Sequence, residues 1–484
     1  MDQQHIVVYE CFIDRTFMHE HQNFRIDNQQ TLQEQPNNKV FHGGSFIGLV
    51  AKDKLDYIQN QVGATHILPT PIMQSKQSHG YAQTDPHRIS RTLGYGEADN
   101  REITNFNSIQ HCIRGANRRM HFGLTGIMHE QEGDDAEDIR DKHIILQDFE
   151  YMKRCVQTIK DQKLELIIDI VPNHMDVDNP FCYQSSHEKD QNIISKEFND
   201  RFQWFKENDW YLGLGFTGLS RLNLPITQEQ LLKDSNPNQL SAYNYVLSSA
   251  LLWIRAGVTH LRCDHVCGPS ILFWNQFTQD LRQYCLKINN KPLYIIGEVN
   301  IQGICDNCQF IAPEVRECVN MYNKAKSVQE KAAAMTKSLN LYQCFDSTFN
   351  FEAYELLPSV VIELASGPQN TLQSRAEQAA LRLHKNRQIF FVENHDTNTL
   401  LFECIKLTNI PNALLLKAAQ ELLHQMHKLS PVLIYYGFEL GLKRRVQSIG
   451  CDTEGVWHNA VREHFQVEEM GVAWNVRTNA NKIE

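Results

Sequence analysis

The chain has 484 residues, 42% of them hydrophobic, and a formal net charge of −10. This acidic balance argues against nucleic acid and an anionic membrane surface as partners. No apolar run approaches the roughly 20 residues that a membrane-spanning helix needs, so we expect a globular chain with one large core.

The N-terminal residues and the cysteines bear on where the protein works. The start, Met-Asp-Gln-Gln-His, has neither a basic segment nor a following apolar region, so no secretory signal is predicted. Thirteen cysteines is an odd number, and several fall within predicted strands and helices, which favours reduced thiols. Cys305 and Cys308 have CxxC spacing, but no second pair or ligand histidine stands beside them. We expect a cytoplasmic protein, or one exported without a conventional signal peptide.

The first third of the chain alternates short apolar runs with long polar stretches. A strand is predicted over residues 6–10, and the polar residues 15–44 predict a long loop. A helix over 52–61 and a second strand over 65–71 follow, and His79-Gly-Tyr81 lies in the next loop.

Residues 88–142 contain few periodic apolar positions. They carry a basic piece with Arg114, Arg118 and Arg119, and an acidic run over 130–138. A long insertion with local structure of its own is expected here, because structureless loops of this length are uncommon. The acidic run is interpreted as a solvated face without chemistry.

Four later apolar runs each turn polar at their C-terminal end. They are residues 166–174, 257–264, 293–299 and 389–396, and each end carries Asp, Glu or His. Such apolar runs fit parallel strands that are covered on both faces, and amphipathic helices are predicted over 146–159, 243–255 and 413–429. Functional residues at the C-terminal ends of several strands are typical of a (β/α)8 barrel.

The run 257–264 ends on an acid that follows an arginine by two residues. Arg262 and Asp264 therefore point to the same side of an extended chain. A cation on that side lowers the pKa of a carboxyl group, which suits a carboxylate that must stay ionised and attack. The alternative is a surface ion pair that only closes a strand end.

Four short motifs in these runs resemble the α-amylase family, glycoside hydrolase family 13. They are DIVPNH (169–174), LRCD (261–264), GEV (297–299) and VENHD (392–396). Residues 6–10, 65–71, 79–81 and 432–437 are also similar to parts of that family's barrel, so the resemblance spans most of the chain.

The resemblance implies an α/β fold, a (β/α)8 TIM barrel with a small domain inserted after the third strand. The barrel would comprise 1–175 and 241–484, with the long insertion at about 88–142, and the inserted domain would comprise 176–240. The β-sandwich that commonly follows this barrel is expected to be absent or rudimentary, because few residues remain after the eighth strand.

The resemblance also assigns catalytic roles to three acids. Asp264 would be the nucleophile, and Glu298 the general acid/base, whose pKa should be raised by burial and by neighbouring acids. Asp396 would be a third carboxylate that stabilises the transition state. This is the pair-of-carboxylates chemistry of a retaining glycosidase.

Further residues match substrate-binding positions of the family. Arg262 would serve the nucleophile and the substrate, Tyr81 would stack on a sugar ring, and His174 and His395 would hydrogen-bond the sugar.

Several positions depart from the family's pattern. Cys267 and Gly268 stand where many amylases have a Lys-His pair that serves acceptor subsites, and Ala82 stands where an Asp often follows the stacking Tyr. Arg221 stands where an Asp is common. Asn173 matches a ligand of structural calcium, but the altered neighbours argue against calcium, so no cofactor or metal is expected.

The function implied is a retaining α-glucan-active enzyme with an α-glucan or maltooligosaccharide substrate and an atypical specificity. Hydrolase and 4-α-glucanotransferase remain alternatives, because both reactions use the same covalent intermediate. A non-catalytic carbohydrate-binding or interaction protein on the same barrel is a third alternative, against which the intact acids argue.

Overall fold

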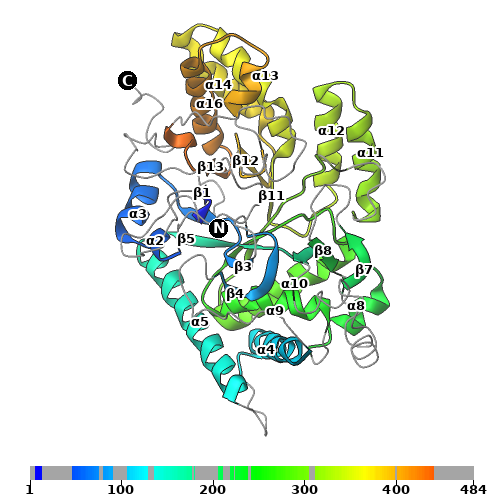
Figure 1. Cartoon of the computed structure of the whole chain (residues 1–484). Coiled ribbons are helices and arrows are strands. Elements are labelled where there is room, and N and C mark those ends of the chain that lie inside the picture. The colour runs from blue at the N-terminus through cyan, green and yellow to red at the C-terminus, as the bar shows by residue number, and fades with distance from the viewer. Residues whose placement is uncertain are drawn as a thin grey trace, which may run out of the picture.

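Eight short parallel strands close into a barrel at the centre of the molecule (Figure 1). Neighbours around the barrel follow chain order, and the last strand pairs with the first. The strands are β1 (Val7–Cys11), β2 (His66–Pro69), β5 (Glu165–Ile170), β9 (His260–Cys263), β10 (Tyr294–Gly297), β11 (Ser347–Phe349), β12 (Gln388–Phe391) and β13 (Val432–Tyr435). The predicted (β/α)8 barrel is therefore confirmed.

The computed structural model describes a large part of the chain. These residues are 6–13, 46–75, 80–90, 106–128, 136–176, 179, 205–210, 219–222, 224–237, 241–302, 304, 311–397 and 400–440. The predicted loop at 15–44, the pair Cys305 and Cys308, and the expected absence of a C-terminal β-sandwich lie outside the described residues, as does most of 176–218.

The barrel strands form because their sequences suit burial on both faces. Every residue of β9, β10, β12 and β13 is buried, as expected of a parallel sheet with side chains inside and helices outside. The polar motifs lie at or just beyond the C-terminal ends of these strands. Asp264 and Glu298 are the first residues after β9 and β10.

Helices surround the barrel (Figure 1). Serine side chains cap several of them, as Ser241 and Ser270 do for the helices on either side of β9 by accepting from Asn244 N and Phe273 N. The helices are α2 (Phe46–Leu49), α3 (Lys52–Asp56), α4 (Phe106–Thr125), α5 (Ala136–Asp161), α8 (Gln228–Asp234), α9 (Ala242–Arg255), α10 (Ile271–Asn289), α11 (Arg316–Lys324), α12 (Val328–Leu339), α13 (Phe351–Ser366), α14 (Leu372–Leu383), α15 (Leu400–Ile405) and α16 (Asn412–His427).

Short turns of other helix types complete the layer. The helix predicted over 52–61 is α3 continued by a π-helical segment, η2 (Tyr57–Val62), and Gly63 ends it in a left-handed conformation with φ 84°. The 3₁₀ turns are η5 (Pro313–Val315), η6 (Gln369–Thr371) and η7 (Phe438–Leu440).

Two small antiparallel sheets leave the barrel near the C-terminal ends of its strands. After β2, strands β3 (Met73–Ser75) and β4 (Gln83–Ile89) pair as a hairpin. After β5, strands β6 (His174–Asp176), β7 (Phe205–Trp210) and β8 (Leu219–Leu222) form a sheet in the order β6–β8–β7. The second sheet belongs to the segment that the sequence assigns to an inserted domain.

In the described part of 88–142, charged residues of α4 pair with charged residues at the start of α5. Asp138 at the start of α5 is 3% exposed and lies 2.6 Å from Nη2 of Arg118 on α4. The interpretation of the acidic run as a solvated face is thus wrong for Asp138. On the same helix Leu146, the first residue of the amphipathic helix predicted over 146–159, is 41% exposed, whereas the neighbouring Ile145 is buried.

None of the helices in the described part of the chain combines the length and the apolar character that a bilayer crossing requires.

Candidate active site

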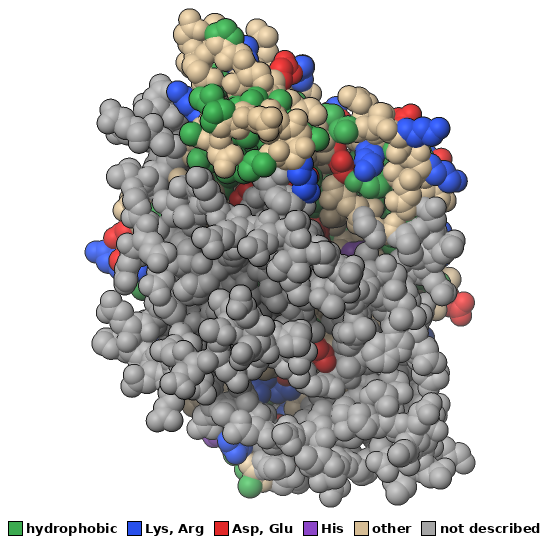
Figure 2. Space-filling view, turned by 45° about the horizontal axis from the view of Figure 1, so that its top comes forward, with side chains coloured by type: hydrophobic (Ala, Val, Ile, Leu, Met, Phe, Trp, Pro, Cys, Tyr) green, Lys and Arg blue, Asp and Glu red, His purple; other side chains and the backbone are tan. Residues whose placement is uncertain are grey.

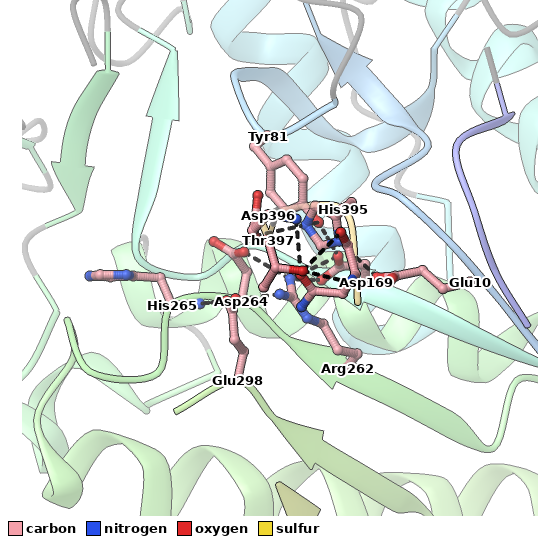
Figure 3. Close-up of polar contacts among 11 residues, drawn as sticks. Glu10, Tyr81, Asp169, Arg262, Asp264, His265, Glu298, His395, Asp396 and Thr397 are labelled. Carbon is pink, nitrogen blue, oxygen red and sulfur yellow. Dashed lines mark hydrogen bonds and ion pairs between the residues drawn. The ribbon is translucent and has the colours of Figure 1, made fainter. Parts of the chain in front are cut away.

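The polar residues predicted at the strand ends meet at the C-terminal face of the barrel (Figure 3). Arg262 lies on β9, Asp264 and Glu298 follow β9 and β10, and His395 and Asp396 follow β12. This is the face at which (β/α)8 barrels carry their functional residues. The Asp396 side chain is 25% exposed, compared with 8% for Asp264 and 7% for Glu298, so the cluster is most open at Asp396.

A single guanidinium group joins three of the acids. Arg262 Nη1 donates to Asp169 Oδ1 and Oδ2 and to Asp264 Oδ1, each at 2.8 Å. Arg262 Nη2 forms an ion pair with Glu298 Oε2, also at 2.8 Å. Asp169 can reach the guanidinium because strand pairing places it directly beside Arg262. A buried cation needs such partners, and the predicted contact between Arg262 and Asp264 is confirmed.

The Arg262 side chain has no exposed surface. The resemblance placed it among the substrate-binding residues, and this burial argues against direct contact with a sugar. Its charge acts on a substrate through the carboxyl groups that it holds.

Burial dominates the titration of the two central acids. Burial raises the pKa of Asp264 to about 6, helped by Asp169 and Asp396 and opposed by Arg262. The expectation of a lowered pKa for Asp264 is therefore wrong, because Asp264 is buried and shares one guanidinium with two other carboxyl groups. Burial, together with Asp264 and Asp396, raises the pKa of Glu298 to about 8 against the opposing charge of Arg262. The expected direction for Glu298 is confirmed.

Glu298 is also held by backbone atoms. The His265 N–H donates to Glu298 Oε2 at 3.0 Å, while the His265 ring points away from the cluster (Figure 3). Gly297 precedes Glu298 because a Cβ at that position would lie 2.8 Å from the ring of Phe345.

His395 lies between two carboxyl groups. Its Nδ1 is 2.7 Å from Glu10 Oε1, and its Nε2 is 3.0 Å from Asp396 Oδ2. Burial alone would lower the pKa of His395, but Asp396 and Glu10 outweigh burial and raise it to about 10. His395 is therefore an imidazolium at neutral pH, with an N–H directed at each carboxyl group.

Tyr81 is tied into the same network. Its hydroxyl donates to Asp169 Oδ2 at 2.8 Å and lies 2.6 Å from His395 Nε2. Its ring stacks on that of His395, with centroids 5.2 Å apart and an angle of 10° between the planes. His395 thus covers one face of the ring that was expected to stack on sugar, and Tyr81 is 8% exposed.

His174 is the first residue of β6. It is buried, and this burial lowers its pKa to about 4 despite a contact with the Tyr81 backbone. The neutral ring lies beside Asn173, whose Nδ2 is 3.3 Å from His174 Nδ1.

Glu10, Asp169 and the His265 amide were not predicted as functional groups. Glu10 and Asp169 are charged residues within predicted apolar strands, 6–10 and 166–170. A charged residue is rarely buried without a partner, so this pattern could have identified both as candidates. The role of the His265 amide could not be predicted from the sequence, because a backbone N–H donor does not depend on residue type.

Comparisons with known proteins agree with this architecture. No family model matches the chain. It is 22% identical over 399 residues to alpha-amylase 2 of Dictyoglomus thermophilum, an alignment covering 82% of this chain and 49% of that protein. It is 22% identical over 312 residues to the cyclomaltodextrin glucanotransferase of Klebsiella oxytoca, covering 62% and 38%. The solved cyclic α-maltosyl-(1→6)-maltose hydrolase of Arthrobacter globiformis, in complex with maltose, superposes with a TM-score of 0.53 at 16% identity, over 91% of this chain and 76% of that one.

The fold and the site together define a (β/α)8 barrel protein with a carboxylate cluster at its C-terminal face. In sequence and in fold the chain is a distant relative of α-amylase-type proteins. It spans less than half the length of the two curated relatives that it matches.

Replacing Glu10 with Gln tests the charge on His395. Gln keeps an oxygen that accepts from His395 Nδ1 but removes one of the two flanking charges, so the pKa of His395 should fall by about 1–3 units. Titrating ¹⁵N-histidine signals from pH 6 to 11.5, with His395→Asn to assign the signal, measures this change. Glu421→Gln, a buried glutamate on α16, is the matched control and should leave the titration unchanged. An unchanged His395 titration in Glu10→Gln would show that Glu10 does not sustain the imidazolium.

Proposed function

We propose that this protein is a retaining enzyme that cleaves or transfers α-1,4-linked glucosyl units of an α-glucan or maltooligosaccharide. The observation that carries the proposal is the sharing of one guanidinium by Asp264 and Glu298, each 2.8 Å from a terminal nitrogen of Arg262. The two terminal nitrogens belong to one rigid plane, so the carboxyl groups are held side by side. This favours the separation of about 5–5.5 Å that retention needs over the wider spacing of inverting enzymes.

The first chemical step follows from the different environments of the two acids. Glu298, with its raised pKa, holds a proton near neutral pH and gives it to the glycosidic oxygen as the C–O bond breaks. Asp264 gives an electron pair to the anomeric carbon and forms a glycosyl ester. Asp396, the most open acid, faces hydroxyl groups of the sugar bound at the cluster.

The second step reverses the roles of the same groups. The Glu298 carboxylate takes a proton from an incoming hydroxyl group, whose oxygen attacks the anomeric carbon, and the bond to Asp264 breaks. Water as acceptor gives hydrolysis, and a sugar hydroxyl group gives transfer.

The substrate class is supported by what the related proteins act on or bind. The two curated relatives are named as an α-amylase and a cyclomaltodextrin glucanotransferase. A Geobacillus thermoleovorans α-amylase with a similar fold was solved with acarbose, and the Arthrobacter hydrolase with maltose. Cys267 and Gly268, which replace an acceptor-site Lys-His pair, are buried. Their burial supports acceptor recognition that differs from the family's common pattern.

The activity should depend on pH as a bell. Catalysis needs Asp264 ionised, so kcat/KM should rise with pH through about 6, and it needs Glu298 protonated, so kcat/KM should fall above about 8. Initial rates on maltoheptaose from pH 4 to 10 measure both limbs. A rate that still climbs at pH 10 would remove Glu298 from the role of acid.

The product ladder from maltoheptaose tests the function itself. Shorter sugars alone indicate a hydrolase, and both shorter and longer sugars indicate a transferase. Glu298→Gln should lower kcat by at least about 10²-fold, as expected for the loss of a general acid, whereas Glu421→Gln on the outer helix α16 should keep wild-type turnover. An unchanged maltoheptaose pool with the wild-type protein would favour a carbohydrate-binding protein without catalysis.

A further inference from the structure

The loop that follows Asp264 is held in a strained conformation. His265 has φ 44°, a left-handed value that residues other than glycine rarely adopt. This conformation directs the His265 N–H at Glu298 Oε2, 3.0 Å away. Such a turn persists only where its surroundings hold it, so the contacts of residues 265–268 decide how firmly the Glu298 carboxyl group is oriented.

Each of the four carbonyl groups of this loop has a donor. Three of the donors belong to the barrel or to the loop itself, and the fourth comes from the β6–β8–β7 sheet. The pairs are Gly268 N to His265 O (3.0 Å), Trp274 Nε1 to Val266 O (2.8 Å), Ala312 N to Cys267 O (2.8 Å) and Arg221 Nη2 to Gly268 O (2.6 Å).

The Arg221 contact joins two parts of the chain that the sequence singled out separately. Arg221 lies on β8, opposite His174 of β6, and its guanidinium reaches the loop beside the acid/base. Its hydrogen bond fixes Gly268, whose N–H in turn fixes the His265 carbonyl group. The path from Arg221 to Glu298 therefore consists of three consecutive hydrogen bonds: Arg221 to the Gly268 carbonyl, the Gly268 N–H to the His265 carbonyl, and the His265 N–H to the Glu298 carboxyl group.

We propose that Arg221 is a positioning residue, which holds the 265–268 turn so that the His265 N–H stays directed at the Glu298 carboxyl group. The catalytic part of this inference rests on the proposed function, whereas the contact with Glu298 does not depend on it.

The surroundings of Asn173 and Gly268 do not fit the calcium ion that the family resemblance associates with Asn173. Calcium takes six to eight oxygen ligands, carboxylates among them. Here a Cβ at position 268 would come within 2.1 Å of Asn173 Oδ1, so that oxygen packs directly against Gly268. The Gly268 carbonyl already binds the fixed positive charge of Arg221. Among the described residues, no three His, Cys, Asp or Glu side chains converge as a metal site. The guanidinium group of Arg221 is the cation that stabilises the 265–268 turn.

The pKa of the Glu298 carboxyl group reports the contact without requiring activity. The charged groups that face Glu298 are Arg262, Asp264 and Asp396, and the His265 N–H favours its ionised form. Losing that N–H should therefore raise the pKa of Glu298 in Arg221→Ala by roughly half a unit to one unit. Selective ¹³Cδ-glutamate labelling, with Glu298→Gln to assign the signal, measures the pKa directly.

Two further variants separate positioning from general stability. Arg221→Lys keeps the charge and one donor, so it should recover part of the wild-type pKa. Arg255→Ala removes an arginine of the same kind, which donates to the Gly123 and Leu124 carbonyl groups between α9 and α4. It should lower the melting temperature and leave the pKa of Glu298 unchanged.

Kinetics and chelation complete the experiment. In Arg221→Ala the fall of kcat/KM on maltoheptaose at alkaline pH should shift to higher pH, following the pKa of Glu298. The kcat should fall about tenfold, and KM should change little. EDTA should leave the melting temperature of the wild type unchanged, and calcium should not restore Arg221→Ala.

Three results would overturn the inference: a wild-type pKa of Glu298 in Arg221→Ala, an equal pKa shift in Arg255→Ala, or destabilisation of the wild type by EDTA. If the wild-type protein is inactive on maltoheptaose but Arg221→Ala shows the expected rise in the pKa of Glu298, the proposed function is contradicted. The positioning role of Arg221 is then still supported.

Discussion

The organisation of the site depends on the burial of one arginine. Arg262 has no exposed surface, and its terminal nitrogens contact Asp169, Asp264 and Glu298. A buried guanidinium must be neutralised, yet three carboxyl groups exceed the charge that it supplies. Burial, together with the neighbouring negative charges, raises the pKa of Asp264 and raises that of Glu298 further. The roles that we propose for Asp264 as nucleophile and for Glu298 as acid would both depend on this shared cation.

A second cation, His395, extends this network towards the open side of the cluster. Glu10 and Asp396 keep its ring charged, and Tyr81 links it to Asp169. Arg221 holds the turn that presents the His265 amide to Glu298. Two cations, Arg262 and His395, thus contact the acids directly, and a third, Arg221 on β8, acts through the backbone.

Much of the fold could be predicted from the sequence, because short apolar runs that end in acids carry both the strand pattern and the direction of the sheet. The three acids, Arg262, Tyr81 and His395 were expected near one another, and the structure brings them together. The pKa of Asp264 was predicted in the wrong direction, because the sequence shows only its neighbour Arg262. Asp169, which shares the Arg262 guanidinium with Asp264, is placed beside Arg262 by the register of β5 against β9. Glu10 and His395 are 385 positions apart, and Arg118 and Asp138 meet between two helices. Contacts of this kind depend on packing, which local patterns do not encode.

We propose that Asp264 and Glu298 work as a closely held pair, one as nucleophile and the other as acid. The stereochemistry of the first product tests it most directly, because a covalent intermediate on Asp264 requires two inversions at the anomeric carbon. Proton NMR of a maltooligosaccharide digest, recorded before mutarotation mixes the anomers, distinguishes the outcomes. Double displacement through Asp264 should release the α-anomer first. Initial release of the β-anomer would mean direct attack by water across a wider gap, about 6.5–9.5 Å, and would contradict the pairing of the two acids on Arg262.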